Sequence, residues 1–356
     1  MYKHIIMSRF GGLGDMVMLT PLLRGIKQLY PEVKLTVVGN NNAKKFMDAC
    51  PFVDEYLTYD KTLKSTWFLI KKLWRADFVY LMDTLYRISV VYALARIKVR
   101  VGLPHKRKKY LTKSLSVEPW MNYAYEPVVY AYFLKRAIGI DVTKISEWDR
   151  LFFPEASNVE KENVKTLLKP LKNKGYITCS LETGGYAKDW PLEHWLVLFQ
   201  KLQLLDKRVV VIGTKSNKYK DIIFPNNVLD LRGRTNLLET GYIIAKAELL
   251  INGCSFPVHV ANAMDIPVIG LYGSQPDYRG RPQRIYASIC SPESCSPCDV
   301  LFNSPGWCEN PHCMKSITPE MVMDKVKQFY ADGMPLGKYR LITGDEYRKD
   351  GFEKEI

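Results

Sequence analysis

The sequence has no apolar run of the roughly 18 residues that a membrane-spanning helix needs. It also shows no signal peptide, because Lys3 and His4 interrupt a very short apolar stretch at the N-terminus. Short internal repeats and low-complexity tracts are missing as well. These absences argue against an integral membrane protein and a secreted one. We expect a soluble cytoplasmic protein, with peripheral attachment to the inner membrane left open.

Acidic residues are fewer than basic residues in this sequence. The 356 residues include 37 Asp and Glu against 51 Lys and Arg, which gives a formal net charge of +14. This surplus favours acidic partners such as phosphorylated substrates, nucleic acid or an anionic membrane surface. The hydrophobic content of 47% is that of a packed globular protein, and the length suggests two domains.

The dinucleotide-binding fingerprint G-x-G-x-x-G is also absent, and no acidic residue at the end of the second predicted strand would bind a ribose. Both absences count against a nicotinamide-dependent dehydrogenase. The first turn instead reads SRFGGLGD over residues 8–15. Its glycines allow the backbone to approach a ligand closely, and Asp15 lies where a helix begins. Asp15 is therefore a candidate base for a substrate hydroxyl, with helix capping as the alternative role.

Short β-rich runs alternate with helical patterns in both halves of the chain, which predicts parallel sheets covered by helices. A looser charged segment at residues 141–160 separates the halves. We expect two Rossmann-like domains that face each other across a cleft, with ligands at the carboxyl ends of the strands. The predicted strands cover residues 3–8, 34–38, 78–82, 98–102, 176–180, 208–212, 228–231, 248–251 and 268–272. The predicted helices cover residues 16–30, 43–50, 66–75, 88–96, 125–138, 191–204, 237–247 and 257–264, and a last one begins near 318.

Two turns in the second half also lead from a predicted strand into a predicted helix. In residues 182–191, Lys188 could neutralise a diphosphate while a threonine and backbone groups donate hydrogen bonds; a solvated lysine is the alternative. In residues 252–259, the start of the helix offers an anion site. His259 lies in its first turn and faces either a ligand or the core. Both turns indicate a phosphate-bearing ligand.

Four stretches match a known pattern in their order and spacing. They are LGD followed by TP within residues 13–21, KDWPLEHW at 188–195, RGRTNL at 232–237, and SFPVH at 255–259 with IPVIGLYG at 266–273. Together they resemble the bacterial heptosyltransferases of the ADP-heptose:lipopolysaccharide type, family 9 glycosyltransferases, over about residues 3–325. The resemblance implies an α/β GT-B fold, in which two Rossmann-like domains face a central cleft. It also implies inverting transfer of a sugar from a nucleotide donor.

The resemblance implies roles for individual residues. Asp15 matches the catalytic base, and Lys188 matches the lysine that binds donor phosphate. The remaining matches are Thr183, Gly184, Thr235, Cys254, Ser255, Phe256 and His259 around the donor, and Arg9, Gly12 and Gly14 in the first loop. We expect an acceptor-side domain at residues 1–155, a donor-binding domain at 156–325, and a helix and tail at 326–356 that pack back toward the first domain.

Two positions depart from the family pattern. The family has an aspartate where this chain has Cys254, and a glycine where it has Phe256. The aspartate contacts hydroxyls of the donor sugar, and cysteine accepts such hydrogen bonds poorly. Phenylalanine adds bulk beside the phosphate loop. These departures leave ADP-heptose, an altered donor and a non-catalytic nucleotide-sugar-binding protein as alternatives.

Five of the eight cysteines crowd between residues 290 and 313. The spacing Cys295-x2-Cys298-x9-Cys308-x4-Cys313 suits a tetrahedral zinc or iron ion. Packed, reduced thiols are the alternative. The resemblance points toward a metal, because an iron site is described in the branch of the family that modifies proteins. We expect a structural ion only, and no cofactor for catalysis.

Basic residues gather at positions 105–113 in the first half. Lys106 and Arg107, with Arg87 after an earlier strand, are candidates for steering an anionic acceptor; a solvated charged face is the alternative. Residues 67–75 (WFLIKKLWR) form a basic amphipathic helix. We interpret this helix as core-facing, with contact to a membrane surface as the alternative.

The leading hypothesis is an inverting glycosyltransferase that moves heptose from ADP-heptose to a hydroxyl of lipopolysaccharide core or of a protein. The basic composition favours the anionic glycolipid, and the cysteine cluster favours the protein. A nucleic-acid-binding protein is the least favoured alternative, because basic and aromatic residues do not surround the cysteine cluster. We therefore expect no nucleic acid partner.

Overall fold

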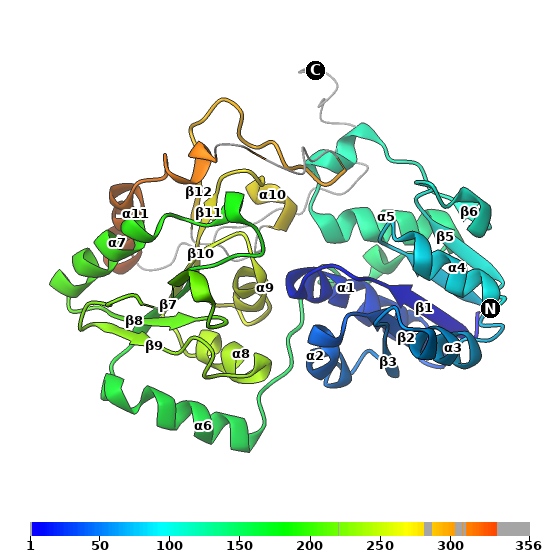
Figure 1. The fold of residues 1–356 in the computed structure, drawn as a ribbon, viewed down its shortest axis with the longest axis horizontal. Coiled ribbons are helices and arrows are strands. Elements are labelled where there is room, and N and C mark those ends of the chain that lie inside the picture. Colours follow the sequence, from blue (N-terminus) through cyan, green and yellow to red (C-terminus); the bar gives the residue numbers. More distant parts are fainter. Residues whose placement is uncertain (1, 220, 281–286, 303–307, 309–310, 333–356) are drawn as a thin grey trace. The chain divides into compact units, whose positions relative to one another are not determined.

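The structure, a computed structural model, describes residues 2–219, 221–280, 287–302, 308 and 311–332. The chain divides into two compact units between Leu151 and Phe152. Each unit contains a six-stranded sheet with helices packed against it (Figure 1). The expected fold class, two Rossmann-like α/β domains, is confirmed at the level of each unit.

The sheet of the first unit has the strand order β3-β2-β1-β4-β5-β6, and all neighbouring strands are parallel. The central strand β1 is fully apolar at its middle, and Ile5, Ile6 and Met7 have no exposed surface. Such a strand is stable only when both faces of the sheet are covered. The strands are β1 (His4–Ser8), β2 (Lys34–Gly39), β3 (Glu55–Thr58), β4 (Phe78–Leu81), β5 (Val99–Gly102) and β6 (Lys113–Ser114).

Helices supply that cover. α3 and α4 pack together and enclose Ile6 and Val79 in one core cluster. Ile5 and Met7 alternate with Ile6 and so point to the opposite face, where α1 and α5 pack together (Figure 1). The helices are α1 (Leu13–Leu29), α2 (Lys44–Asp48), α3 (Leu63–Lys72), α4 (Tyr86–Leu94) and α5 (Glu126–Ile138).

The sheet of the second unit has the order β12-β11-β10-β7-β8-β9, again with parallel neighbours. Its core contains the edge-to-face pair Trp190 and Trp195, whose ring centroids lie 4.8 Å apart. The strands are β7 (Tyr176–Ser180), β8 (Arg208–Ile212), β9 (Val228–Asp230), β10 (Leu249–Gly253), β11 (Val268–Tyr272) and β12 (Ala287–Cys290). The helices are α6 (Asn158–Leu168), α7 (Leu192–Leu204), α8 (Leu237–Ala245), α9 (Phe256–Ala263), α10 (Asp277–Gly280) and α11 (Pro319–Asp332).

Both sheets reverse their strand order next to their first strand, between β1 and β4 and between β7 and β10. Crevices outside the carboxyl ends of strands at such a reversal are where α/β proteins bind ligands. The loops that follow β1, β4, β7 and β10 are therefore the segments to inspect for a site.

Several elements differ from the sequence-based expectation. The strands β3, β6 and β12 were not predicted, and α6 begins inside the segment expected to be loose. The segment 326–356 was expected to pack toward the first domain. Its start lies in α11, where Val326 is fully buried in the core of the second unit, and residues 333–356 lie outside the described residues. Among the described helices, none has the length and apolar character needed to cross a membrane.

Candidate functional site

The loop after β1 presents Asp15 at the start of α1. Gly12 is the N-terminal cap of the helix, and its backbone N–H donates to Asp15 Oδ2 at 2.5 Å. A Cβ atom at Gly11 would overlap the same carboxylate, so this turn needs glycine there. Asp15 therefore caps its helix and remains partly exposed, with 22% of its side chain accessible. The two roles that the sequence offers for Asp15 are compatible.

Arg9 binds three carboxylates at once. Its guanidinium lies 2.7 Å from Asp15, 2.9 Å from Glu126 and 3.0 Å from Asp83. Burial alone would lower the pKa of Arg9, but the three negative charges outweigh it and raise that pKa. The resemblance places Arg9 at a basic position in the first loop, and in this structure its guanidinium is paired with the three carboxylates.

Asp83 and Glu126 are functional candidates that the sequence analysis missed. Asp83 follows β4 and accepts a hydrogen bond of 2.5 Å from the backbone N–H of Phe10. Burial raises the pKa of Asp83 more than the charge of Arg9 lowers it. Glu126 is the first residue of α5 and is fully buried. Asp83 could have been found from the sequence, because it follows a predicted central strand. No local pattern identifies Glu126 as a site residue.

The three basic residues expected to steer an acceptor lie in different environments. Arg87 and Lys106 are exposed. Arg107 is fully buried and donates to the carbonyl oxygens of Leu103 and Leu81 and to the hydroxyl of Ser89. Burial lowers its pKa to about 10. Arg107 thus ties strand ends together inside the first unit, and its side chain does not contribute to a surface charge.

In the second unit, the loop after β7 holds Lys188 at the carboxyl edge of the sheet. Asp189 Oδ1 accepts hydrogen bonds from the backbone N–H and the hydroxyl of Thr183, at 2.7 and 2.9 Å. Lys218 neutralises the other oxygen of Asp189 at 2.8 Å. Within the described residues the ammonium group of Lys188 has no ion-pair or hydrogen-bond partner. The loop is thus held by Asp189 and leaves the neighbouring ammonium available for an anion.

This loop lies directly against the end of β10. A Cβ atom at Gly253 would stand 3.0 Å from the carbonyl oxygen of Lys188 and 3.2 Å from Cγ2 of Thr183. Gly253 therefore lets the two loops approach closely, and the contact brings Lys188 and Thr183 beside the start of α9. Gly184 belongs to the same loop, and a side chain there would meet open space. The structure thus brings together the predicted phosphate residues of this unit.

Asn252 fixes the turn into α9. Its Oδ1 accepts from the backbone N–H of Ser180 at 2.7 Å, and its Nδ2 donates to Ser255 Oγ at 2.8 Å. Ser255 occupies the N-terminal cap position of α9 without a side-chain capping hydrogen bond, and the N–H groups of a first helical turn can bind an anion together with the helix dipole. His259 is buried, and its ring packs against Gly280 of α10, where a Cβ atom would lie 2.8 Å away. Asn252 is a further residue that the sequence analysis did not single out.

The side chain of Phe256 packs within the second unit. Its ring packs against Phe153 with the centroids 5.8 Å apart. Phe153 in turn fills the space above Gly241 of α8, where any Cβ atom would overlap its ring. Cys254 is half-buried and is not part of a disulfide. The unusual phenylalanine therefore has a packing partner, whereas nothing in the structure explains the cysteine.

Thr235 lies beyond β9, in a turn organised by an arginine. Arg232 forms a two-pronged ion pair with Asp230, with both N–O distances 2.9 Å. Gly233 has a φ of 69°, a left-handed conformation that glycine adopts without strain. The hydroxyl of Thr235 lies 2.9 Å from that of Thr240 in α8. The structure therefore places the hydroxyl of Thr235 against α8.

Within the residues that the structure describes, the cysteine cluster does not form a complete metal centre. Cys295, Cys298, Cys308 and Cys313 are not joined by disulfides. Burial raises the pKa of the Cys313 thiol. Across the described ranges no three His, Cys, Asp or Glu side chains are arranged so that they could hold an ion.

The strand-end loops described above agree with the family to which the chain is similar. The family model for "Glycosyltransferase family 9 (heptosyltransferase)" matches residues 66–304. The chain belongs to this family. It is therefore a glycosyltransferase, an enzyme that transfers a sugar to an acceptor.

Individual relatives agree with the family. The "Lipopolysaccharide core heptosyltransferase OpsX" of Haemophilus influenzae is 23% identical over 309 residues, which cover 81% of this chain and 84% of that protein. The solved "ADP-heptose lps heptosyltransferase II" of E. coli superposes with a TM-score of 0.70 at 18% identity, covering 93% of this chain and 99% of that one. The iron-containing dodecameric glycosyltransferase TibC of enterotoxigenic E. coli superposes with a TM-score of 0.59 at 15% identity and covers 92% of this chain and 78% of that one. At these identities the solved structures establish the shared fold.

Proposed function

We propose that this enzyme is an inverting heptosyltransferase that transfers heptose from ADP-heptose to a hydroxyl of lipopolysaccharide core. The observation that carries the proposal is the unpaired ammonium of Lys188 beside the start of α9 (within the described residues), at the point where the strand order reverses. A cation and free helix N–H groups in one crevice suit the diphosphate of a sugar nucleotide. The names of the relatives supply the donor and the acceptor, and the basic composition agrees with an anionic acceptor.

The chemistry follows from the charges. Asp15 takes the proton of the acceptor hydroxyl as its oxygen attacks the anomeric carbon. The bond between that carbon and the diphosphate oxygen breaks, and the nucleoside diphosphate leaves with increased negative charge. Lys188 and the first turn of α9 stabilise this charge without a metal ion. A single displacement with one carboxylate inverts the configuration at the anomeric carbon.

Two measurements test the proposal. Calorimetric titration with ADP, UDP, GDP and ADP-heptose should show binding of ADP and ADP-heptose only. Asp15→Asn should keep this binding and lower turnover by a factor of about 10² to 10⁴. Absence of nucleotide binding would refute the whole proposal, whereas binding without turnover in the unmodified chain would favour a non-catalytic sugar-nucleotide-binding protein.

An altered donor sugar is the second candidate, and Cys254 and Phe256 favour it. The family's aspartate at position 254 would accept hydrogen bonds from sugar hydroxyls, and a thiol does this poorly. Titration with a series of ADP-sugars distinguishes the two. Tighter binding of an ADP-sugar other than ADP-heptose would establish the altered donor.

We assign the acceptor to the domain at residues 1–155 and the donor to the domain at residues 156–325. Arg87 and Lys106 are exposed cations in the first of these and are proposed to attract the acceptor. With a glycolipid acceptor, the enzyme would work at the cytoplasmic face of the inner membrane. Transfer to purified lipopolysaccharide core, compared with transfer to protein acceptors, tests this assignment.

A structural zinc or iron ion at Cys295, Cys298, Cys308 and Cys313 belongs to the same proposal. Its support is the donor set, four cysteine side chains of the kind that both metals bind, and the likeness in fold to TibC, an iron-containing glycosyltransferase. Elemental analysis of protein purified without chelators should find one ion per chain, and the double variant Cys295→Ser/Cys298→Ser should lose it. Metal-free protein with unchanged stability would refute the ion.

A further inference from the structure

The helix α3 carries large apolar side chains on its outer face. Its inner face packs normally, because Leu69 and Ile70 are buried in the core of the first unit. On the outer face, Leu63 is 81% exposed, Trp67 61% and Phe68 51%. Side chains of this size seldom gather in water without a partner. The helix is thus apolar on two faces, and the sheet covers one of them.

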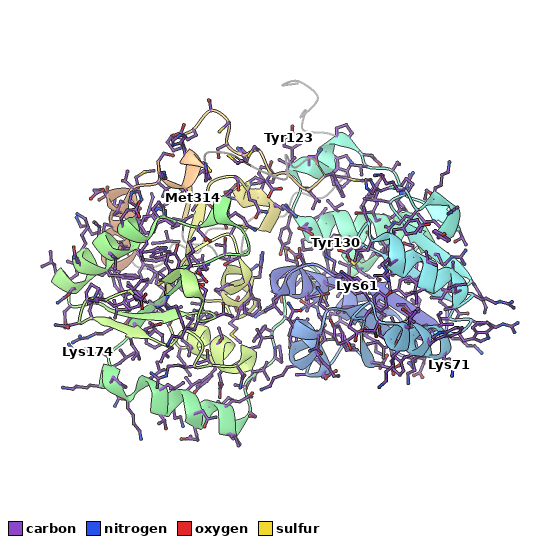
Figure 2. All side chains as sticks on the ribbon, in the orientation of Figure 1. Lys61, Lys71, Tyr123, Tyr130, Lys174 and Met314 are labelled. Carbon is purple, nitrogen blue, oxygen red and sulfur yellow. The ribbon has the colours of Figure 1, made fainter. Side chains whose placement is uncertain are left out.

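Basic side chains are interleaved with this apolar face. At a spacing of four residues, which places side chains one above another on a helix, Leu63, Trp67 and Lys71 form one row. Lys64, Phe68 and Lys72 form the next row. Lys71 lies at the outer edge of the first unit in Figure 2. The first row therefore has two apolar side chains followed by a lysine, and the second row has a phenylalanine between two lysines.

The charges of this face are only partly neutralised. Residues 59–75 contain five basic side chains and one acidic one. Lys72 pairs with Glu55 at 2.7 Å. The acidic residue, Asp60, accepts hydrogen bonds from the backbone N–H and the hydroxyl of Thr62, the N-terminal cap of α3. In the part of the chain that the structure describes, Lys64 and Lys71 have no acidic partner. The face is therefore cationic as well as apolar.

The apolar surface continues beyond the end of the helix. Trp74 is 48% exposed, and the guanidinium of Arg96 stacks on its ring at 5.3 Å from the centroid. Arg75 is hydrogen-bonded through its backbone to Ala95 at the end of α4. We call the outer side chains of Leu63, Lys64, Trp67, Phe68, Lys71 and Trp74 the α3 face.

We propose that the α3 face docks the enzyme on an anionic phospholipid bilayer. Tryptophan and phenylalanine enter the boundary between headgroups and acyl chains, and lysines beside them bind anionic headgroups through flexible stems. A protein partner would need an acidic side chain placed opposite each lysine. An anionic bilayer presents negatively charged headgroups along the whole length of both rows. The charge complementarity favours the bilayer.

The docking face is linked to the candidate catalytic loop within the same unit. The hydroxyl of Thr66 in α3 lies 3.4 Å from the hydroxyl of Tyr59. Tyr59 packs edge-to-face on Phe10, with centroids 6.2 Å apart, and Phe10 follows Arg9 directly. These contacts connect α3 to the loop that presents Asp15. A bilayer bound to α3 would therefore hold a membrane-borne acceptor near that loop.

Vesicle co-sedimentation of the full chain tests the proposal. The unmodified protein should bind phosphatidylcholine vesicles weakly and vesicles containing phosphatidylglycerol strongly. Trp67→Ser/Phe68→Ser should lower binding to both kinds of vesicle, about tenfold for the anionic ones. Lys64→Gln/Lys71→Gln should lower only the binding to anionic vesicles, by a similar factor. Thermal unfolding should be unchanged in all these variants, because the substituted side chains are exposed.

The matched control removes exposed apolar groups elsewhere. Leu204 and Ile223 of the second unit are 86% and 91% exposed, and Leu204→Ser/Ile223→Ser should bind vesicles like the unmodified protein. Equal loss in this control, or no binding of the unmodified protein to anionic vesicles, would overturn the proposal. A dimer in sedimentation velocity that Trp67→Ser/Phe68→Ser converts to a monomer would overturn it in favour of a second copy of the chain. Since the vesicles contain no acceptor, this outcome is independent of the proposed transfer reaction.

Discussion

Arg9 holds the carboxylate of Asp15 through Nη2 at 2.7 Å, and the same nitrogen lies 2.9 Å from Glu126. Two carboxylates therefore share one donor atom, one of them partly exposed and the other fully buried. Charges this close interact strongly where water is excluded. Glu126 thus sets the electrostatic environment of the proposed base without itself being exposed to a substrate.

Glu126→Gln removes that negative charge. Arg9 then acts more strongly on Asp15, and the pKa of the Asp15 carboxyl falls. The acidic limb of the pH profile of kcat/KM should move to lower pH, and the plateau should fall about tenfold because the base is weaker. Glu118→Gln is the control, since Glu118 accepts from Trp120 and Tyr132 in the same unit. A shift toward higher pH, or the same shift in the control, would show that Glu126 does not tune Asp15.

Lys188→Ala should weaken the binding of ADP about 10- to 100-fold, the usual effect of losing a charge-assisted hydrogen bond. The melting temperature should not change, because Lys188 has no ion pair within the described residues. Isothermal titration measures the first and calorimetric scanning the second. Lys201→Ala is the control, because this lysine pairs with Glu320 on the surface and should leave ADP binding intact. Unchanged ADP affinity in Lys188→Ala would exclude the proposed phosphate contact.

Phe256→Ala should destabilise the chain by about 1–3 kcal/mol, because it removes a partly buried ring from Phe153. Phe153→Ala should cost more, about 3–5 kcal/mol, since Phe153 is buried and fills the space above Gly241. Urea denaturation measures both. Cys254→Asp should leave stability nearly unchanged and alter the affinity for ADP-sugars. If Phe256→Ala costs nothing while ADP-sugar binding improves, the phenylalanine serves the ligand pocket and not the packing of α9.

Arg232→Gln should show a pH-dependent loss of stability. Burial raises the pKa of Asp230, but the hydrogen bonds and charge of Arg232 outweigh it and lower that pKa below its ordinary value of 3.8. The ion pair therefore contributes fully above that value, and its contribution disappears as the pH falls through the lowered pKa. Urea denaturation should show a difference of about 1 kcal/mol near neutral pH. The difference should shrink in acid; a gap that stays constant down to acid pH would mean that packing, and not charge, is lost.

The sequence predicted the long and strongly patterned elements and missed the short ones. β1 and β10 are apolar runs next to glycine-bearing turns, and both were predicted with their loops. β3 (Glu55–Thr58) has four residues and β6 (Lys113–Ser114) two, and such short runs do not differ from loop sequence until a neighbouring strand pairs with them. These strands exist because of tertiary pairing, which the local sequence does not contain.

The same limit applies to the candidate site. Asp15 and Lys188 lie in turns whose residue pattern is itself unusual, so the sequence was enough to predict their positions at the strand ends. Glu126 reaches Arg9 across 117 positions of the chain, and no local pattern reports such a contact. Arg107 resembles its three basic neighbours in sequence, but the 3-10 turn that follows directs it into the core. For α3, the pattern indicated a face that packs on the core, which Leu69 and Ile70 form, and it left contact with a membrane surface open as the alternative.

The repeated strand order of the two sheets has an evolutionary consequence. Each unit has its own sheet and its own core, and each presents its chemical groups on loops that leave the sheet intact when they change. On the proposed assignment of the acceptor to the first domain and the donor to the second, substitutions in the loops after β1 and β4 would alter acceptor binding, and those after β7 and β10 would alter donor binding. A lineage built this way can recombine halves, and a chimera that joins residues 1–151 of this chain to the second half of a relative would inherit its two specificities separately.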